Sequence, residues 1–193
     1  MKWKIIIPSA VVAVAAIALV TAVMGGAHGS AVPGPAGVSQ GANNAPTVLP
    51  VTSNPIKNTS TAPGLVLVGA MAENNVDPVT KQTIADRLQV QLKNTSSGTL
   101  SGFEIFYTMT DMTTKSSESY YTPLAGLSLA PGQEVTVYFD NQTGANHYPE
   151  NKFSLYRSSK NEVDFTIQVS AKGVAVANGT AVKGAGTGEV VGG

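Results

Sequence analysis

Cysteine is absent from the 193 residues of this chain. The absence excludes thiol catalysis, disulfide bonds, iron–sulfur clusters and zinc sites built on cysteine. It also excludes membrane attachment through a lipidated cysteine. Cofactors bound through cysteine are thereby ruled out, and we expect no cofactor of another kind.

Charge is scarce, and acidic residues are missing from the first 72 positions. Lys2 and Lys4 precede a long apolar run, and the first acid is Glu73. The chain beyond those two lysines carries ten basic and twelve acidic residues, a net charge of −2. A mildly acidic body with no stripe of Lys and Arg offers no surface for a phosphate backbone. Nucleic acid is therefore not an expected partner.

The longest uncharged apolar run covers residues 5–26, between Lys4 and Lys57. Its length matches a hydrocarbon core of roughly 30 Å, and the positive flank predicts a cytoplasmic N-terminus with the rest outside. Residues 1–29 fit an uncleaved membrane anchor because the run exceeds the apolar core of a signal peptide. They also fit a cleaved signal peptide, since small residues surround Ser30. Both interpretations predict an extracytoplasmic protein, either membrane-anchored or secreted.

Residues 30–64 contain six of the eleven prolines, no aromatic residue and a single charge. Such a segment buries too little apolar surface to offset its backbone entropy, which predicts a disordered or extended linker. Residues 184–193 are rich in glycine and predict a flexible tail.

Between these segments, residues 65–183 show apolar side chains at every second position. The alternation is clearest over residues 87–93, 103–110, 134–140 and 163–170, and it is typical of half-buried strands. Shorter strand candidates are residues 65–71, 118–121, 153–156 and 173–176, and residues 80–87 fit one helical turn at most. Seven or eight short strands separated by turns predict an all-β fold, an antiparallel β-sandwich.

Two stretches, LQVQLKNTSSGTLSGFEIFYTMTD and LAPGQEVTVYFD, span residues 88–140. They resemble the Ig-like and fibronectin-III-like modules of bacterial and archaeal surface proteins. The resemblance lies in the turns, an Asn-Thr-Gly-like turn after one strand and a Leu-x-x-Pro-Gly turn before a later one. It implies an Ig-like sandwich in an extracellular setting, and such modules share no catalytic residues.

The loop after residue 140 is the strongest candidate site by composition. It connects two predicted strands through about twelve residues, a length at which loops are often functional. His147 is the only histidine beyond residue 64, and no second member of a catalytic pair is evident in the sequence. We therefore expect a ligand or partner contact here rather than an active site. The contact residues expected in this loop are Asp140, Asn141, His147, Tyr148 and Glu150.

Three aromatic residues, Phe106, Tyr138 and Tyr156, fall on the polar side of their predicted strands. If they come together they form an apolar patch, the mark of an interaction surface. Calcium binding is an alternative, because the loop after residue 140 contains side-chain oxygens of the kind that bind calcium. The same holds for a second loop with Asn74, Asn75 and Asp77. Four Asn-x-Ser/Thr sequons, at Asn58, Asn94, Asn141 and Asn178, predict accessible glycan acceptors.

These patterns predict a non-catalytic, exported β-sandwich that is an interaction or structural module at the cell surface. Its partner is an unidentified protein or a cell-surface glycan, with the membrane as a further contact if residues 1–29 are retained. One alternative is a module that recognises carbohydrate or calcium. Another is an accessory subunit of a membrane enzyme or transporter.

Overall fold

The computed structural model describes residues 48–73 and 88–186, all within one compact unit, Ala42–Gly193. The apolar run at residues 5–26, the segment at residues 80–87 and the tail from residue 187 lie outside the described residues. The predictions for them stay predictions. In the described part, no helix is long and apolar enough to cross a membrane.

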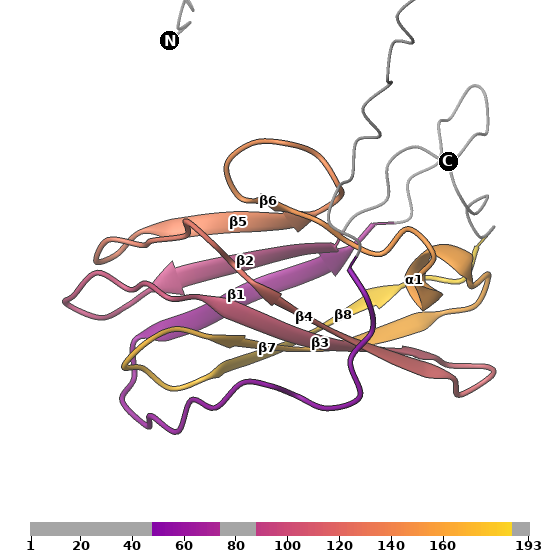
Figure 1. Cartoon of the computed structure of the whole chain (residues 1–193), viewed down its shortest axis with the longest axis horizontal. Coiled ribbons are helices and arrows are strands. Elements are labelled where there is room, and N and C mark those ends of the chain that lie inside the picture. Colours follow the sequence, from indigo (N-terminus) through magenta and orange to yellow (C-terminus); the bar gives the residue numbers. More distant parts are fainter. Residues whose placement is uncertain (1–47, 74–87, 187–193) are drawn as a thin grey trace, which may run out of the picture. The chain divides into compact units, whose positions relative to one another are not determined.

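Two four-stranded sheets face each other as a β-sandwich (Figure 1). The first has the order β1-β2-β5-β6, with β1 Leu65–Ala72, β2 Leu88–Asn94, β5 Glu134–Phe139 and β6 His147–Tyr148. The second has the order β4-β3-β7-β8, with β4 Ser117–Pro123, β3 Glu104–Asp111, β7 Val163–Ser170 and β8 Ala177–Lys183. Neighbouring strands are antiparallel except β5 and β6, which are parallel. The predicted all-β fold with two antiparallel-rich sheets is confirmed.

The period of two in the sequence determines which side chains face the core. In β3, Ile105, Tyr107 and Met109 are buried, whereas Phe106 and Thr108 lie half-buried on the outer face. The same alternation holds in β2 and β7. A strand shifted by one residue would expose its whole apolar set, and each large side chain contributes about 1.5–3 kcal/mol on burial.

Aromatic rings fill the space between the sheets. The ring of Tyr107 lies 5.6 Å from Tyr120, 5.6 Å from Phe139 and 6.4 Å from Phe165, measured between centroids. Phe165 in turn meets Tyr156 edge-on at 5.5 Å. Offset and edge-to-face pairs of this kind add to the stabilisation from burial alone.

Two of the shorter strand predictions are wrong. Residues 153–156 contain the start of helix α1, Leu155–Ser158, where the amides of Arg157 and Ser158 both donate to the Ser154 carbonyl. Its position is fixed by tertiary contacts, since the Leu155 amide donates to the Glu118 carboxylate at 2.9 Å. Residues 173–176 include a turn at Gly173, whose φ of 80° favours glycine, and the strand follows as β8.

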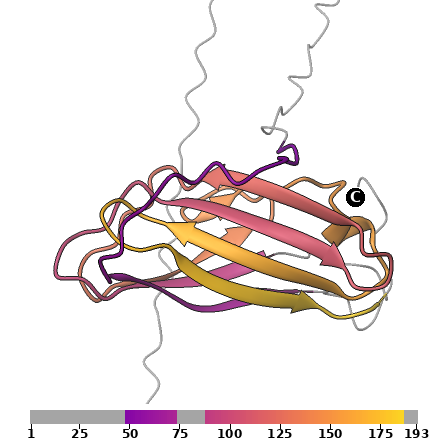
Figure 2. The ribbon, with the colours of Figure 1, turned by 90° about the horizontal axis from the view of Figure 1, so that it is seen from below.

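The sequence predicts a disordered or extended linker over residues 30–64, and the described part of it, residues 48–64, is extended and hydrogen-bonded to the sandwich. These residues run across the outer face of the second sheet, from β4 toward the end of β7 (Figure 2). The Val51 amide donates to the Ser119 carbonyl at 2.7 Å, and Asn54 donates to Gln168 at 2.5 Å. The Asn58 side chain reaches the Val174 carbonyl at 2.8 Å. Hydrogen bonds to the second sheet therefore hold this proline-rich segment, together with the packing of the partly buried Val48 against the core.

The edge strands β1 and β8 lie side by side and close one flank of the sandwich. Leu67 of β1 packs over Gly179 of β8, where an added Cβ would stand 2.6 Å from a Leu67 methyl carbon. A register shift between Leu67 and Gly69 marks an irregularity in β1. The absence of a side chain at Gly179 therefore permits the close approach of the two edges.

Two buried polar residues fix the turns at opposite ends of the sheets. Asn94, fully buried at the end of β2, donates to the carbonyls of Gly98 and Leu129 at 2.7 and 2.9 Å. The side-chain oxygen of Asn94 accepts hydrogen bonds from the amide and the hydroxyl of Ser96, at 2.8 and 2.7 Å. Asp111, at the end of β3, accepts the Ser159 hydroxyl at 2.6 Å. This hydrogen bond and those from the Thr114 amide, Asn161 and the Thr113 amide hold the pKa of the Asp111 carboxyl well below its ordinary range.

Candidate ligand-binding surface

The three aromatic residues expected to form a patch are separated in the structure. Phe106 lies on the outer face of β3 in one sheet, and Tyr138 lies on the outer face of β5 in the other. Tyr156 belongs to α1 and is 1% exposed, with its ring against Phe165. The expected joint patch does not form, because residues 153–156 are not a strand and the other two residues point away from opposite sheets.

The loop between β5 and β6 contains a carboxylate–imidazole pair. The Nδ1 atom of His147 lies 2.9 and 3.0 Å from the two carboxylate oxygens of Asp140, and its ring stacks on Tyr138 at 5.0 Å. Asp140 is thus the partner that the sequence did not reveal. The two residues come together because β6 pairs with β5 in parallel after left-handed backbone at Asn141 and Asn146.

The pair orients the imidazole and leaves Nε2 as the remaining ring nitrogen. In the described part of the chain, no hydroxyl is hydrogen-bonded to His147, whose side chain is 20% exposed. Nucleophilic catalysis requires such a hydroxyl or thiol beside the base. The geometry therefore shows an oriented base without an adjacent nucleophile.

The other predicted loop residues hold the loop in place. Glu150 is buried and pairs with Arg157, and its amide donates to the Asn141 side-chain oxygen at 3.0 Å. Tyr148 is buried, and its hydroxyl donates to the Ala125 carbonyl at 3.4 Å. Because the carboxylates of Asp140 and Glu150 are both engaged in this way, the loop geometry does not favour calcium binding there. The residues Asn74, Asn75 and Asp77 lie outside the described residues.

A buried tyrosine network continues from this loop into the core. Tyr120 donates to Glu118 at 2.8 Å and accepts from Asn151 at 3.1 Å. Burial, aided by nearby carboxylates, raises the pKa of both Tyr107 and Tyr120 well above the ordinary value. Both phenols therefore stay protonated at neutral pH, and that of Tyr120 donates its hydrogen bond to Glu118.

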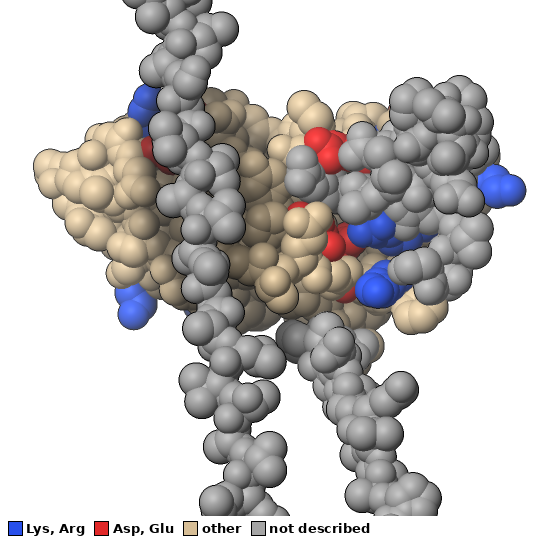
Figure 3. All heavy atoms as spheres, turned by 90° about the horizontal axis from the view of Figure 1, so that it is seen from above, with Lys and Arg blue, Asp and Glu red and all other residues tan. Residues whose placement is uncertain are grey.

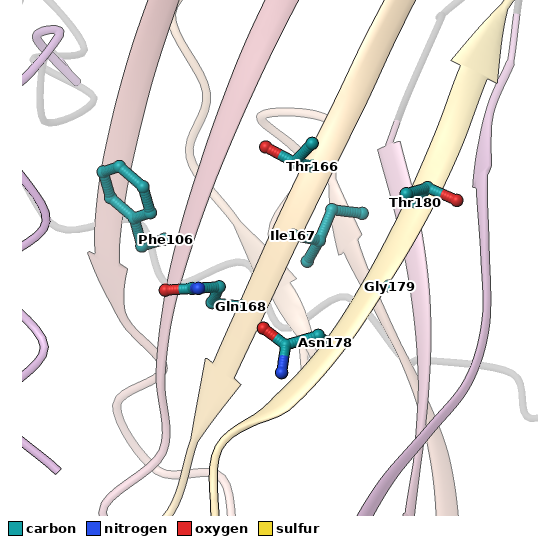
Figure 4. Close-up of a pocket in the computed structure, with 7 residues that line it drawn as sticks. All are labelled: Phe106, Thr166, Ile167, Gln168, Asn178, Gly179 and Thr180. Atoms are coloured by element: carbon teal, nitrogen blue, oxygen red, sulfur yellow. The ribbon is translucent and has the colours of Figure 1, made fainter. Parts of the chain in front are cut away.

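A shallow groove of about 390 Å³ lies on the outer face of the second sheet (Figure 4). Its side chains come from three neighbouring strands, with Phe106 on β3, Thr166 and Gln168 on β7, and Asn178 and Thr180 on β8. Gly179 and Ile167, whose side chain is buried in the core, complete the lining. An aromatic ring, two amides and two hydroxyls thus share one open surface.

Strand register arranges these residues in two rows across the sheet. Phe106 pairs with Gln168, and Gln168 pairs with Asn178. In the next row, Thr166 pairs with Thr180. Antiparallel strands lie about 4.8 Å apart, so consecutive side chains in a row are spaced by that distance. The rows give the groove a regular pattern of hydrogen-bonding groups.

Sequence reasoning identified Phe106 but missed the groove around it. The alternation over residues 163–170 places Thr166 and Gln168 on the polar side of their strand, and in the structure both lie on the outer face of β7. β8 was not predicted as a strand, because ANGTAVK has no clear alternation of large apolar residues. Without β8, the alignment of Asn178 and Thr180 beside β7 could not be foreseen.

Of the four sequon asparagines, Asn178 is exposed, Asn58 and Asn141 are half-buried, and Asn94 is buried. Asn58 and Asn94 are hydrogen-bonded into the fold, and Asn141 accepts the Glu150 amide. Asn178 is exposed, with a single 3.5 Å contact to the Val176 carbonyl. The expectation of four accessible acceptors is therefore wrong for the buried Asn94, and Asn178, the most exposed of the four, lies in the groove.

Charged residues are scattered over the surface. On the face shown in Figure 3, the described basic and acidic side chains do not join into a stripe of one sign. In the described part of the chain, no three His, Asp or Glu side chains lie close enough to hold a metal ion. The groove is thus the described surface on which uncharged hydrogen-bonding groups and an aromatic ring gather.

Comparison with known proteins shows no family. No protein-family model matches the chain, and no curated protein matches it. Among solved structures, the chain is similar to the crystal structure of a protein described as ApaA, from Bordetella pertussis. The match has 13% sequence identity and a TM-score of 0.37, and it covers 65% of this chain and 97% of the other. Similarity at this level gives no information about function.

Proposed function

We propose that this protein is an exported, non-catalytic β-sandwich of the Ig-like type that binds a ligand or partner at the cell surface. The observation that carries the proposal is the groove formed by Phe106, Gln168 and Asn178 with two threonines. An open surface of this size and composition suits recognition. It is set on paired strands, which hold binding groups more precisely than loops do.

Export rests on the sequence. The basic start at Lys2 and Lys4, followed by the uncharged run at residues 5–26, directs the rest of the chain across a membrane. A retained run tethers the sandwich, and a cleaved one releases it. The turn motifs of residues 88–140 support the Ig-like assignment within the two-sheet fold.

Site-specific photocrosslinking in the source cells tests the proposal. A photoreactive residue replaces Thr180 in the groove in one strain and Thr143 in the β5–β6 loop in another, both exposed positions. We expect irradiation of intact cells to yield a discrete higher-mass product from position 180 and none from position 143. A product from position 143 alone would assign recognition to the loop, and no product from either would contradict the proposed function.

A further inference from the structure

We propose that the groove binds a neutral polysaccharide, with Phe106 beneath a sugar ring and the amides and hydroxyls of β7 and β8 bonded to sugar hydroxyls. The proposal rests on the proposed function and names the ligand class of the same site. It follows from the charge, the chemistry and the spacing of the lining residues.

The groove lining carries no charge. All seven lining residues are neutral, and the nearest acid on the same face of β7 is Asp164, two residues from Thr166. Phosphate or carboxylate ligands require cationic or helix-terminal partners, and none of the lining residues supplies them. An apolar peptide would require more apolar side chains than Phe106, because the side chain of Ile167 is buried in the core. A neutral, hydroxyl-rich ligand remains the best chemical match.

The lining groups match the hydrogen-bonding character of sugars. A sugar hydroxyl both donates and accepts, as do the side-chain amides of Gln168 and Asn178 and the hydroxyls of Thr166 and Thr180. The half-buried ring of Phe106 offers an apolar face for the C–H side of a pyranose. Each type of group on the ligand therefore has a counterpart in the groove.

The two rows suit a chain more than a single sugar. Strand spacing of about 4.8 Å is close to the length of one pyranose unit, so a row across β3, β7 and β8 presents a new side chain to each successive sugar. β8 is the last strand of the second sheet and packs against Leu67 of β1 at Gly179, so the exposed side chains of Asn178 and Thr180 form the end of the two rows.

The segment before β1 orients one of the binding groups. Asn54 donates to the Oε1 atom of Gln168 at 2.5 Å, which turns the Nε2 amide of Gln168 into a fixed donor for the ligand. Asn54 is thus a positioning residue. Asn54→Ala should therefore weaken polysaccharide binding. The loss of affinity should be smaller than the loss caused by Phe106→Ala.

Affinity electrophoresis of the full chain in gels with dissolved polysaccharide tests the ligand class. The neutral panel is β-glucan, xylan, mannan and amylose, and the contrast is polygalacturonate. We expect at least one neutral polymer to retard the protein, and polygalacturonate to leave it unretarded. Phe106→Ala should weaken the retardation at least tenfold, and Asn178→Ala by several fold.

Tyr138→Ala is the matched control, because Tyr138 is also a half-buried aromatic residue but lies on the outer face of the opposite sheet. It should leave retardation unchanged. Thr180→Arg, at an exposed position, blocks the groove without disturbing the core, so it replaces Phe106→Ala if that variant fails to fold. No retardation by any neutral polymer, or retardation that survives Thr180→Arg, would overturn the inference. A crosslink from position 180 without polysaccharide binding would leave the proposed function standing and refute only this ligand class.

Discussion

Asn94→Ala should destabilise the sandwich strongly, although it removes only a small polar side chain. The side chain is fully buried and makes four hydrogen bonds, two donated to backbone carbonyls and two accepted from Ser96. Each such bond contributes about 1 kcal/mol net. The carbonyl of Leu129 keeps its bond from the Leu100 amide, so it is not left unpaired.

The expected loss in the free energy of unfolding is therefore about 3 kcal/mol. It is less than the sum of four bonds because some of the groups that lose Asn94 as a partner can hydrogen-bond to water instead. For a domain of this size it corresponds to a fall in Tm of about 10 °C. Urea unfolding followed by far-UV circular dichroism measures it directly. Circular dichroism is preferable to indole fluorescence because the only tryptophan in the sequence is Trp3, which is not among the described residues.

Asn178→Ala is the control, since Asn178 is also a sequon asparagine but is exposed with one 3.5 Å contact. It should change the free energy of unfolding by less than about 0.5 kcal/mol. Equal effects of the two substitutions would refute the reasoning, because they would show that the buried bonds of Asn94 contribute nothing beyond those of a surface amide.

Three further predictions concern acid stability, strand packing and modification. Because the pKa of Asp111 is lower in the folded protein than its unfolded value of 3.8, the charged carboxylate stabilises the fold above that pH, and this stabilisation is lost as the pH falls below 3.8. Asp111→Asn should therefore lower the free energy of unfolding at pH 7. It should also reduce the change in that free energy between pH 4 and pH 2, as measured by acid titration. Gly179→Ala should destabilise by about 1–3 kcal/mol by overpacking, and Leu67→Ala should recover part of that loss in a double-mutant cycle of urea unfolding. When the chain is expressed in a heterologous host that glycosylates exported proteins, where the glycan serves only as a probe of exposure, peptide mass spectrometry of the folded protein should find glycan at Asn178 and none at Asn94, which is buried.

Each of these has a clear contrary outcome. An unchanged acid profile in Asp111→Asn would show that the hydrogen bonds to that carboxylate do not favour its charged form. Additive effects of Gly179→Ala and Leu67→Ala on the free energy of unfolding would show that the side chain of Leu67 does not interact with residue 179. Glycan at Asn94 in folded protein would contradict the burial of its side chain.

The strands with strong alternation could be predicted from the sequence because burial of one face determines both strand and register. β2, β3 and β7 have apolar residues at every second position, and they form the centre of the sandwich. β8 and α1 could not be predicted, since Gly179 and Leu155 are placed by contacts with β1 and with Glu118. Such contacts join residues distant in sequence, which local patterns do not record.

The candidate site could be predicted only in part for the same reason. Phe106 could be identified because it falls on the polar side of its predicted strand. The groove around it depends on the pairing of β3, β7 and β8. The loop at residues 140–150 was favoured for its composition, and several of its polar groups instead bond to one another or to Arg157. Composition indicates which groups are present, and pairing decides which of them face a ligand.

The most direct test of the central claim is an NMR titration of the full chain with a polysaccharide that retards it in the gel. Amide shifts should change at Phe106, Thr166, Gln168, Asn178 and Thr180 and stay constant at Tyr138 and His147. Shifts confined to the β5–β6 loop, or no shifts at all, would contradict the assignment of the groove as the binding surface.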